Sequence, residues 1–513
     1  MHAVGGSHSR WSCDQRQERV SEHDASSERE KSVTDLDAVA RQALTDNHFQ
    51  PELDADAQRE LATLPSTSGL GGLRDLCDLG WSSIDNAESK DLDQIELVDA
   101  LPDGGVRLRV AIADVDAIVP KGSALDRHAA ANATSVYTGI AVYPMLPREV
   151  SEGQSSLLEG ADRPVVVIEL ELTRDGTVRA RDVYRAAARN HAKLAYDSVG
   201  SWLEGRGPVP PVVAAMPGLE EQLWLQDRTA SLLKSLREKA GALELDTAEA
   251  SAVGQNGKVQ SITVTRKNRA RDLIEDFMIA ANVAIAQYLA DEQRSAIRRV
   301  VRVPRRWDRI VALAATFGGT LPATPDARAL ADFLAVRRAA DPLRFPDLSL
   351  SIVKLLGPGE YVLDRPGAAD DEGHFGLAAH DYSHATAPNR RYADLVTQRL
   401  VKAAIAGAPA PYSDDELAAI AQLCTERENA ANRVERVTRK AAAALLLAPR
   451  IGSVFDAIVT GVNKDGTYVR LLSPPAEGRV VHGEAGMDVG ERVRVKLVAT
   501  DPRRGFIDFA GVS

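Results

Sequence analysis

Cysteine is scarce in this chain of 513 residues. Cys13, Cys77 and Cys424 are the only three cysteines and lie far apart, so the chain contains no CxxC pair. Both a disulfide framework and a cysteine-based zinc site are therefore disfavoured. A chain of this length can bury a large core without crosslinks, and at ~100–200 residues per domain it is expected to form about three domains.

Long apolar runs are also missing. No stretch approaches the ~18 apolar residues of a transmembrane helix, and the N-terminus lacks the apolar core of a signal peptide. The sequence therefore predicts a cytoplasmic protein in a reducing compartment, with no membrane partner.

An overall positive charge, typical of nucleic-acid-binding proteins, is absent, since the net charge is −11. The charge is uneven, however. Residues 1–84 carry 8 Lys and Arg against 15 Asp and Glu, which leaves the remaining 429 residues at only −4. These contain a strongly basic run, residues 294–309 (RSAIRRVVRVPRRWDR). A local basic track matters more for polyanion binding than the net charge does.

The N-terminal region divides into two parts. Residues 1–32 are polar and lack periodic apolar residues, which predicts a disordered tail. Residues 33–72 show apolar residues at helical spacing and predict a small helical unit, with a third helix at 73–79. This unit could be a helix-turn-helix, or an arm packed on the main domain.

The rest of the chain predicts an α+β fold with a small β-barrel at its end. Between residues 73 and 447, strand patterns occur at 106–119, 165–172 and 179–186, and helical patterns at 271–290 and 415–447. Residues 448–513 give short strands separated by Gly and Asp turns, which favours a five-stranded barrel. In that barrel Tyr468, Arg470, His482 and Phe455 could form a nucleic-acid-binding face, although Phe455 and Tyr468 could equally belong to its core.

The segment at residues 83–94 (SIDNAESKDLDQ) concentrates negative charge. Asp85, Asp91 and Asp93 fall within nine residues, and carboxylates gathered without counter-charge repel one another. A bound Mg²⁺ or Mn²⁺ would relieve that repulsion, since both ions prefer oxygen ligands. A solvated acidic loop is the alternative. An EF-hand is excluded, because Lys90 stands where that loop requires glycine.

A second segment, residues 382–400 (YSHATAPNRRYADLVTQRL), places two arginines at a predicted helix start. Arg390 and Arg391 follow a turn at Pro388, and guanidinium groups bind phosphate oxygens bidentately. They could form a phosphate clamp or be ordinary surface charges.

Together these segments resemble the ribonuclease II and ribonuclease R family, the RNB-domain exoribonucleases. The family's acidic motif (IDxxxxxDxDD) is matched by residues 84–94, and its arginine motif (YxHxTSPIRRYxDL) by residues 382–395. VAIADV (110–115), YPMLPRE (143–149) and DLIEDFMIAAN (272–282) match as well. The resemblance spans about residues 75–445, and the C-terminal barrel is similar to the family's OB-fold barrel of the ribosomal S-one type.

The resemblance implies a processive 3′→5′ hydrolysis of RNA to nucleoside 5′-monophosphates, with Mg²⁺ as cofactor and Mn²⁺ as a substitute. It implies catalytic and metal-binding roles for some residues and RNA contacts for others. The catalytic set is Asp85, Asp91, Asp93 and Arg390; the metal set is Asp85, Asp91, Asp93 and Gln94; the RNA-binding set is Tyr137, Arg391, Tyr382 and His384. We expect a monomer acting on single-stranded RNA, with duplex RNA carrying a 3′ overhang as a second candidate substrate. A core position for Tyr137, an RNA-binding protein with a decayed nuclease site, and a DNA-binding regulator are the alternatives.

The chain departs from the family pattern in three places. Gln94 stands where the family has a fourth aspartate, and Ala387 and Asn389 replace the usual serine and isoleucine, which suggests altered loop packing. The 84 residues before Asp85 do not read as the family's two cold-shock barrels. From this we expect a wider channel mouth and a greater tolerance of structured RNA.

Overall fold

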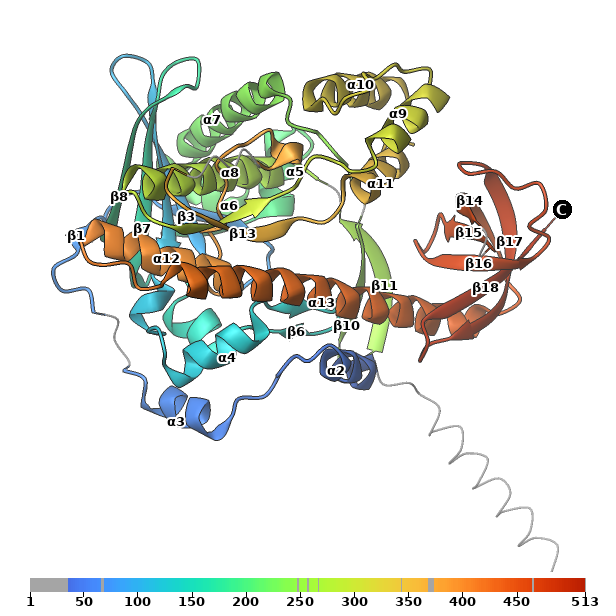
Figure 1. Cartoon of the computed structure of the whole chain (residues 1–513), viewed down its shortest axis with the longest axis horizontal. Helices are drawn as coiled ribbons and strands as arrows, with labels where there is room; N and C mark the ends of the chain where they lie inside the picture. The colour runs from blue at the N-terminus through green and yellow to red at the C-terminus, as the bar shows by residue number, and fades with distance from the viewer. Residues whose placement is uncertain are drawn as a thin grey trace, which may run out of the picture.

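The computed structural model describes residues 36–65, 69–246, 249–255, 258–265, 267–342, 344–367, 373–463 and 466–512. The predicted tail at residues 1–32 lies outside this range. Figure 1 shows helices gathered around a central sheet, with a small barrel at one end of the molecule.

The central sheet has seven strands in the order β1-β8-β7-β4-β3-β2-β9. The strands are β1 (Arg74–Asp75), β2 (Ser82–Asp85), β3 (Gln94–Ala100), β4 (Val106–Ala113), β7 (Asp162–Leu172), β8 (Val178–Arg189) and β9 (Ala192–Ala195). Neighbouring strands are antiparallel except for the parallel pairs β1·β8 and β2·β9. The three predicted strands are confirmed. The first ends at Ala113, because the Asp114 side chain caps a 3₁₀ turn by accepting a hydrogen bond from the Ala117 N–H (3.2 Å).

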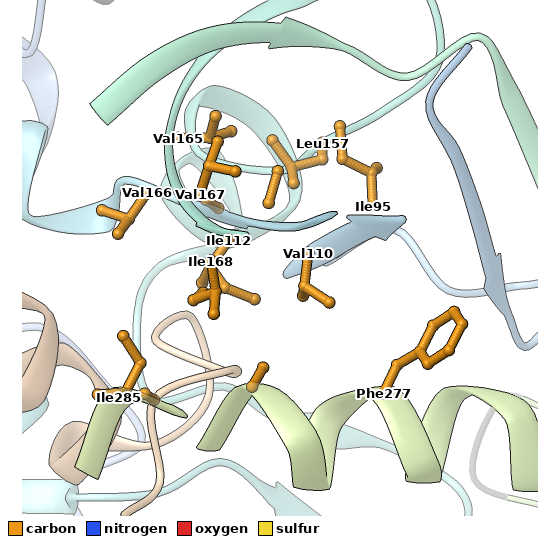
Figure 2. Close-up of a cluster of buried hydrophobic side chains, with 14 of the residues drawn as sticks. Ile95, Val110, Ile112, Leu157, Val165, Val166, Val167, Ile168, Phe277 and Ile285 are labelled. Atoms are coloured by element: carbon orange, nitrogen blue, oxygen red, sulfur yellow. The ribbon is translucent and has the colours of Figure 1, made fainter. Parts of the chain in front are cut away.

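Helix α8 (Arg269–Asp291) covers one face of this sheet and confirms the helix predicted at 271–290. Figure 2 shows Phe277 and Ile285 of α8 turned toward Val110, Ile112 and Ile168 of the sheet. By length and composition α8 could cross a membrane, but 61% of its apolar window is buried inside the protein. Core packing therefore explains its apolar character.

The remaining helices and hairpins surround the sheet. The helices are α4 (Ala124–Asn132), α5 (Tyr196–Leu203), α6 (Pro211–Ala215), α7 (Leu219–Ala240), α9 (Trp307–Thr316), α10 (Ala327–Ala340), α11 (Phe345–Leu356) and α12 (Tyr392–Ile405). The two-stranded pairs are β5 (Val136–Tyr137) with β6 (Val142–Tyr143), β10 (Glu249–Gln255) with β11 (Lys258–Thr265), and β12 (Ala296–Val300) with β13 (Glu360–Asp364). Helices α9, α10 and α11 enclose a hydrophobic cluster of their own.

A single helix, α13 (Asp414–Leu447), runs along the domain that contains the central sheet and ends at the barrel (Figure 1). Its start is fixed by a capping box, in which Ser413 and Glu416 satisfy each other's backbone N–H groups. The barrel is closed, in the order β14-β15-β16-β18-β17, as predicted. Its strands are β14 (Val454–Asn463), β15 (Gly466–Leu471), β16 (Glu477–His482), β17 (Arg492–Asp501) and β18 (Phe506–Gly511).

Two residues of the predicted RNA-binding face of the barrel contact other parts of the protein instead. Phe455 is buried in the barrel's hydrophobic core, which is the alternative that the sequence left open. Arg470 forms an ion pair with Asp347 of α11 (2.7 Å), so this arginine ties the barrel to the rest of the protein. Tyr468 and His482 stay predictions.

The N-terminal helices α2 (Leu36–Asp46) and α3 (Ala55–Thr63) pack on different parts of the protein. Helix α2 contacts α13, and α3 contacts α4. The structure thus favours the packed arm over the helix-turn-helix. The third helix predicted at 73–79 is wrong: this stretch contains β1, and the Leu76 N–H continues the pairing with β8 by bonding to the Ala187 carbonyl (2.9 Å).

Three arginines of the basic run at 294–309 are held in ion pairs, whereas Arg305, Arg306 and Arg309 are exposed. Arg298 pairs with Asp364 and Asp381, and Arg302 pairs with Glu360. Arg299 is held bidentately by Glu428 of α13. These ion pairs connect β12 and the residues directly after it to carboxylates on adjacent elements.

Candidate functional site

A cavity of about 270 Å³ lies where the β2–β3 connection meets the loop before α12. The acidic segment contributes Asp85, Asp91, Asp93 and Gln94 to its lining. Arg390 comes from the loop before α12, and Tyr137 from β5. Six of the nine candidate side chains therefore meet in one cavity, although about 300 positions separate the two segments in the sequence.

The position of Asp85 follows from the sheet. It is the last residue of β2, paired with Ala195 of the parallel strand β9. Its Oδ1 accepts hydrogen bonds from the Asn86 N–H (2.6 Å) and the Ser89 hydroxyl (3.0 Å). These bonds turn the chain directly after β2, so that the loop returns Asp91 and Asp93 to the same cavity.

Asp93 is almost fully buried, with 2% of its surface exposed. Its Oδ1 accepts a hydrogen bond from the Asn389 N–H (2.9 Å), and its Oδ2 accepts one from the Arg390 Nε–H (3.3 Å). Burial nevertheless raises the pKa of Asp93 to about 7, against the opposing effect of Arg390. Burial also raises the pKa of Asp91. Burial thus disfavours the charged form of both carboxyl groups.

Arg390 and Tyr137 keep accessible surface at the cavity. The Arg390 side chain is 45% exposed although it contacts Asp93, so part of the guanidinium is open to a ligand. Tyr137 is 41% exposed, and its backbone N–H is fixed by Glu435 of α13 (3.0 Å). The alternative of a core tyrosine is thus wrong for Tyr137.

Three predicted RNA contacts do not reach the cavity in this structure. Arg391 donates two hydrogen bonds to the fully buried Asp394, both of 2.8 Å. Tyr382 is buried, and the His384 ring bonds to the hydroxyl of Tyr361 (2.8 Å). Burial together with nearby Arg391 lowers the pKa of His384 well below its ordinary range. This geometry supports a packing role for the three residues, and their contact with RNA stays a prediction.

The loop that presents Arg390 is held by buried hydrogen bonds. The Asn282 side chain of α8 accepts from the Ala385 N–H (2.8 Å), and the Ala387 N–H donates to Asp394 (2.8 Å). The Asn389 side chain accepts from the Ser155 hydroxyl (2.5 Å). The departures at 387 and 389 are thus buried packing positions that leave Arg390 in place.

The cavity also contains residues that the sequence reading missed. Arg271 of α8 stacks over the ring of Tyr196 (4.4 Å) and donates to the Asn86 side chain (2.9 Å). Tyr196 and Arg271 come from the starts of α5 and α8, far apart in the chain. The one indication of their role in the sequence was the position of Arg271, directly before the segment 272–282 that matches the family.

The donor set fits a hard divalent cation. Within the described parts of the chain, no three His, Cys, Asp or Glu side chains already converge as ligands. However, the three aspartates and Gln94 bring carboxylate and amide oxygens to one cavity, where three carboxylates face the two guanidinium groups of Arg271 and Arg390. Both carboxylate oxygens of Glu96, two residues beyond Gln94, are also buried without a hydrogen-bond partner.

Comparisons with known proteins identify two matching families. Residues 73–407 match the RNB domain, and residues 453–512 match the RNase II-type exonuclease C-terminal S1 domain. Ribonuclease R of Thermotoga maritima is 30% identical over 497 residues, covering 89% of this chain and 68% of that protein. Ribonuclease R of Escherichia coli K12 is 29% identical over 479 residues, covering 86% of this chain and 58% of that protein. The chain thus spans about three fifths to two thirds of the length of these relatives.

The fold is similar to that of Mycoplasma genitalium RNase R. The apo form of that protein has a TM-score of 0.82 at 23% identity, covering 93% of this chain and 78% of that chain. Its complexes with ribose-methylated single-stranded RNA and with double-stranded RNA give TM-scores of 0.82 and 0.81.

Proposed function

Because this chain belongs to the RNB-domain exoribonuclease family, we propose that it hydrolyses RNA from the 3′ end and releases nucleoside 5′-monophosphates. The observation that carries the proposal is the convergence of Asp85, Asp91, Asp93 and Arg390 on one cavity. Single-stranded RNA is the proposed substrate, in the cytoplasm, and the protein is proposed to act as a monomer.

The carboxylates would hold the metal. We assign Asp85, Asp91 and Asp93 as ligands, with Gln94 as a neutral oxygen donor, and Mg²⁺ as the ion that Mn²⁺ can replace. When bound, the ion supplies a more acidic water and a positive charge for the leaving oxygen. The protein itself holds this acidic loop in place through the Asp85 turn and through the Asp93–Asn389 hydrogen bond.

Arg390 and Tyr137 would act on the RNA. The exposed part of the Arg390 guanidinium can donate to phosphate oxygens and offset the charge that grows on them during hydrolysis. The Tyr137 ring offers a stacking surface for a base near the 3′ end, and stacking tolerates any base. Together these roles describe a nuclease that does not read sequence.

The test uses the full chain with three RNA substrates: a 5′-labelled single strand, a circle, and a duplex with a 3′ overhang. With Mg²⁺ or Mn²⁺ we expect the linear strand to shorten from its 3′ end, with nucleoside 5′-monophosphates as products, and the circle to persist. Degradation of the circle would contradict the proposal. RNA binding without mononucleotide release under either metal would favour the decayed-site alternative, which Gln94 motivates. The duplex measures tolerance of structure.

The substitution Gln94→Asp tests the neutral donor. Adding a carboxylate at a cavity-lining position is expected to lower the Mg²⁺ concentration for half-maximal activity by roughly tenfold, equivalent to ~1.4 kcal/mol of added metal affinity. The measurement is a Mg²⁺ titration of the initial hydrolysis rate. Gln287→Glu, which places a charge on α8 outside the cavity and keeps an acceptor for Arg181, is the control. An unchanged titration for Gln94→Asp would remove position 94 from the metal site.

The substitution Tyr137→Ala tests the stacking surface. Losing one base stack costs ~1–3 kcal/mol, so we expect RNA affinity to fall by roughly 10- to 100-fold. The measurement is direct binding of single-stranded RNA in buffer without divalent ions. Tyr137→Phe retains the ring and should bind as the native chain does; equal weakening by both variants would assign the effect to the hydroxyl instead.

A further inference from the structure

Strand β3 carries a carboxyl group that the fold leaves unpaired. Glu96 has no exposed surface, and neither of its carboxylate oxygens has a hydrogen-bond partner. The residue opposite it on β2 is Ser82, whose hydroxyl is also buried and unpartnered. Folded proteins rarely leave such groups unsatisfied, because their loss of hydration is not repaid. Glu96 therefore calls for an explanation beyond packing.

The strand geometry directs Glu96 toward the layer that contains the cavity. Gln94 and Glu96 are two residues apart in β3, so their side chains leave the same face of the sheet. Gln94 lines the cavity, together with Ile274 and Met278 of α8. Val110, paired with Glu96 on β4, faces α8 in Figure 2. Glu96 thus lies under α8, one pleat repeat deeper than Gln94.

The acidic cluster and Glu96 influence each other's neighbours electrostatically. After burial, the Asp85 carboxylate is the group that raises the pKa of Glu96 above its ordinary range. Asp85 and Glu96 also raise the pKa of Tyr196, a cavity-lining residue, after the larger effect of burial.

We propose that Glu96 supplies the fourth carboxylate of the divalent-cation site, in place of the one that position 94 lacks. The family pattern has an aspartate at 94, where this chain has a neutral glutamine. A glutamate two residues further on leaves the same face, and its side chain is one methylene longer than that of aspartate. The Glu96 carboxylate would thereby replace the negative charge that Gln94 lacks. This inference rests on the proposed metal-dependent function, and the bound cation is what would satisfy the unpaired oxygens.

The experiment measures Mn²⁺ binding to the full chain without RNA, by electron paramagnetic resonance of free Mn²⁺ and by calorimetry. Glu96→Gln keeps the shape and removes the charge, and it is expected to weaken Mn²⁺ binding by at least roughly tenfold, or ~1.4 kcal/mol. The double variant Gln94→Asp with Glu96→Gln moves the carboxylate back to 94 and should bind within about threefold of the native chain. Glu171→Gln, which removes the same charge from the far part of β7, should bind as the native chain does.

Four outcomes are decisive. Weakened binding by Glu96→Gln with recovery in the double variant supports the proposal. Native-like binding by Glu96→Gln, while Asp93→Asn binds more weakly, overturns it and leaves the metal site intact. Weakened binding without recovery also overturns it, because the loss would then be structural. Absence of Mn²⁺ binding by the native chain overturns the proposed metal-dependent function itself.

A folding control separates the two kinds of failure. In metal-free buffer Glu96→Gln is expected to melt at or above the native temperature, since it removes a buried carboxyl that lacks a partner. If Glu96→Gln does not fold, Glu96→Met, of similar length and no charge, replaces it in the same titrations. Addition of Mn²⁺ should raise the melting temperature of the native chain more than that of either variant.

Discussion

Asp93→Asn is expected to lower kcat by at least roughly 10³-fold, the scale set by removal of one key electrostatic group from an active site, while RNA affinity stays within about threefold. Asp93 is buried in the wall of the cavity, whereas Tyr137 and the Arg390 side chain, the proposed RNA contacts, are partly exposed. The substitution should therefore remove chemistry and spare binding.

Two effects combine at this position. The variant lacks the negative charge proposed to bind the cation, in a setting where burial already raises the pKa of Asp93 to about 7. In addition, an asparagine amide cannot accept from both the Asn389 N–H and the Arg390 Nε–H, since one of its two terminal atoms is a donor. The loop that presents Arg390 therefore loses one of its anchors.

The measurements are single-turnover rates with saturating Mg²⁺ and RNA affinity without metal. Asp126→Asn is a matched control, because Asp126 is also buried and paired with an arginine, Arg399, outside the cavity (2.8 Å). That variant should lose stability and keep the turnover of its folded fraction. Near-native turnover of Asp93→Asn with an ordinary metal requirement would refute the metal assignment.

Arg390→Lys is expected to lower kcat by roughly 10²-fold, comparable to the loss of one oxyanion donor, with KM within a fewfold of the native value. Lysine keeps the charge but lacks the planar fork that can hold Asp93 and a phosphate at once. Because phosphate charge grows in the transition state, the loss should appear in kcat.

A control for loss of the fork alone is Arg269→Lys. Arg269 holds Asp227 through two nitrogens (3.0 and 2.7 Å) and does not line the cavity. This variant should melt earlier and retain kcat. A rise in KM alone for Arg390→Lys would make Arg390 a general phosphate anchor rather than a group acting in the transition state.

Local patterns predicted most of the fold. The strand pattern at 165–172 and the helical pattern at 415–447 each predicted the element that the structure contains, β7 and α13. The third helix was wrong because residues 73–79 contain apolar residues at helical spacing, while the open edge of β8 captures Arg74 and Asp75 as a strand. Edge pairing of this kind depends on a partner about 110 residues away, which no local pattern reveals.

The sequence predicted only part of the site, because the rest depends on contacts between segments that lie far apart in the chain. Ordered motifs identified the family correctly and located the acidic loop and Arg390. They also assigned an RNA contact to Arg391, and could not reveal that Asp394, three residues further on at the start of α12, binds its guanidinium group. Arg271 and Tyr196 meet only through the packing of α8 against α5. Glu96 looked like an ordinary strand residue until its burial was known.

Helix α13 fixes the orientation of the barrel about the helix axis, relative to the rest of the protein. One uninterrupted helix of 34 residues connects contacts with α2 and β13 to contacts with β17 and β18 of the barrel. Each residue of an α-helix turns the chain by about 100° and advances it by about 1.5 Å. Inserting a single residue in its middle would swing the barrel about a quarter turn around the helix axis and break the Arg470–Asp347 ion pair. Among homologues, length variation should therefore collect in surface loops and avoid this helix, or come as multiples that restore its phase.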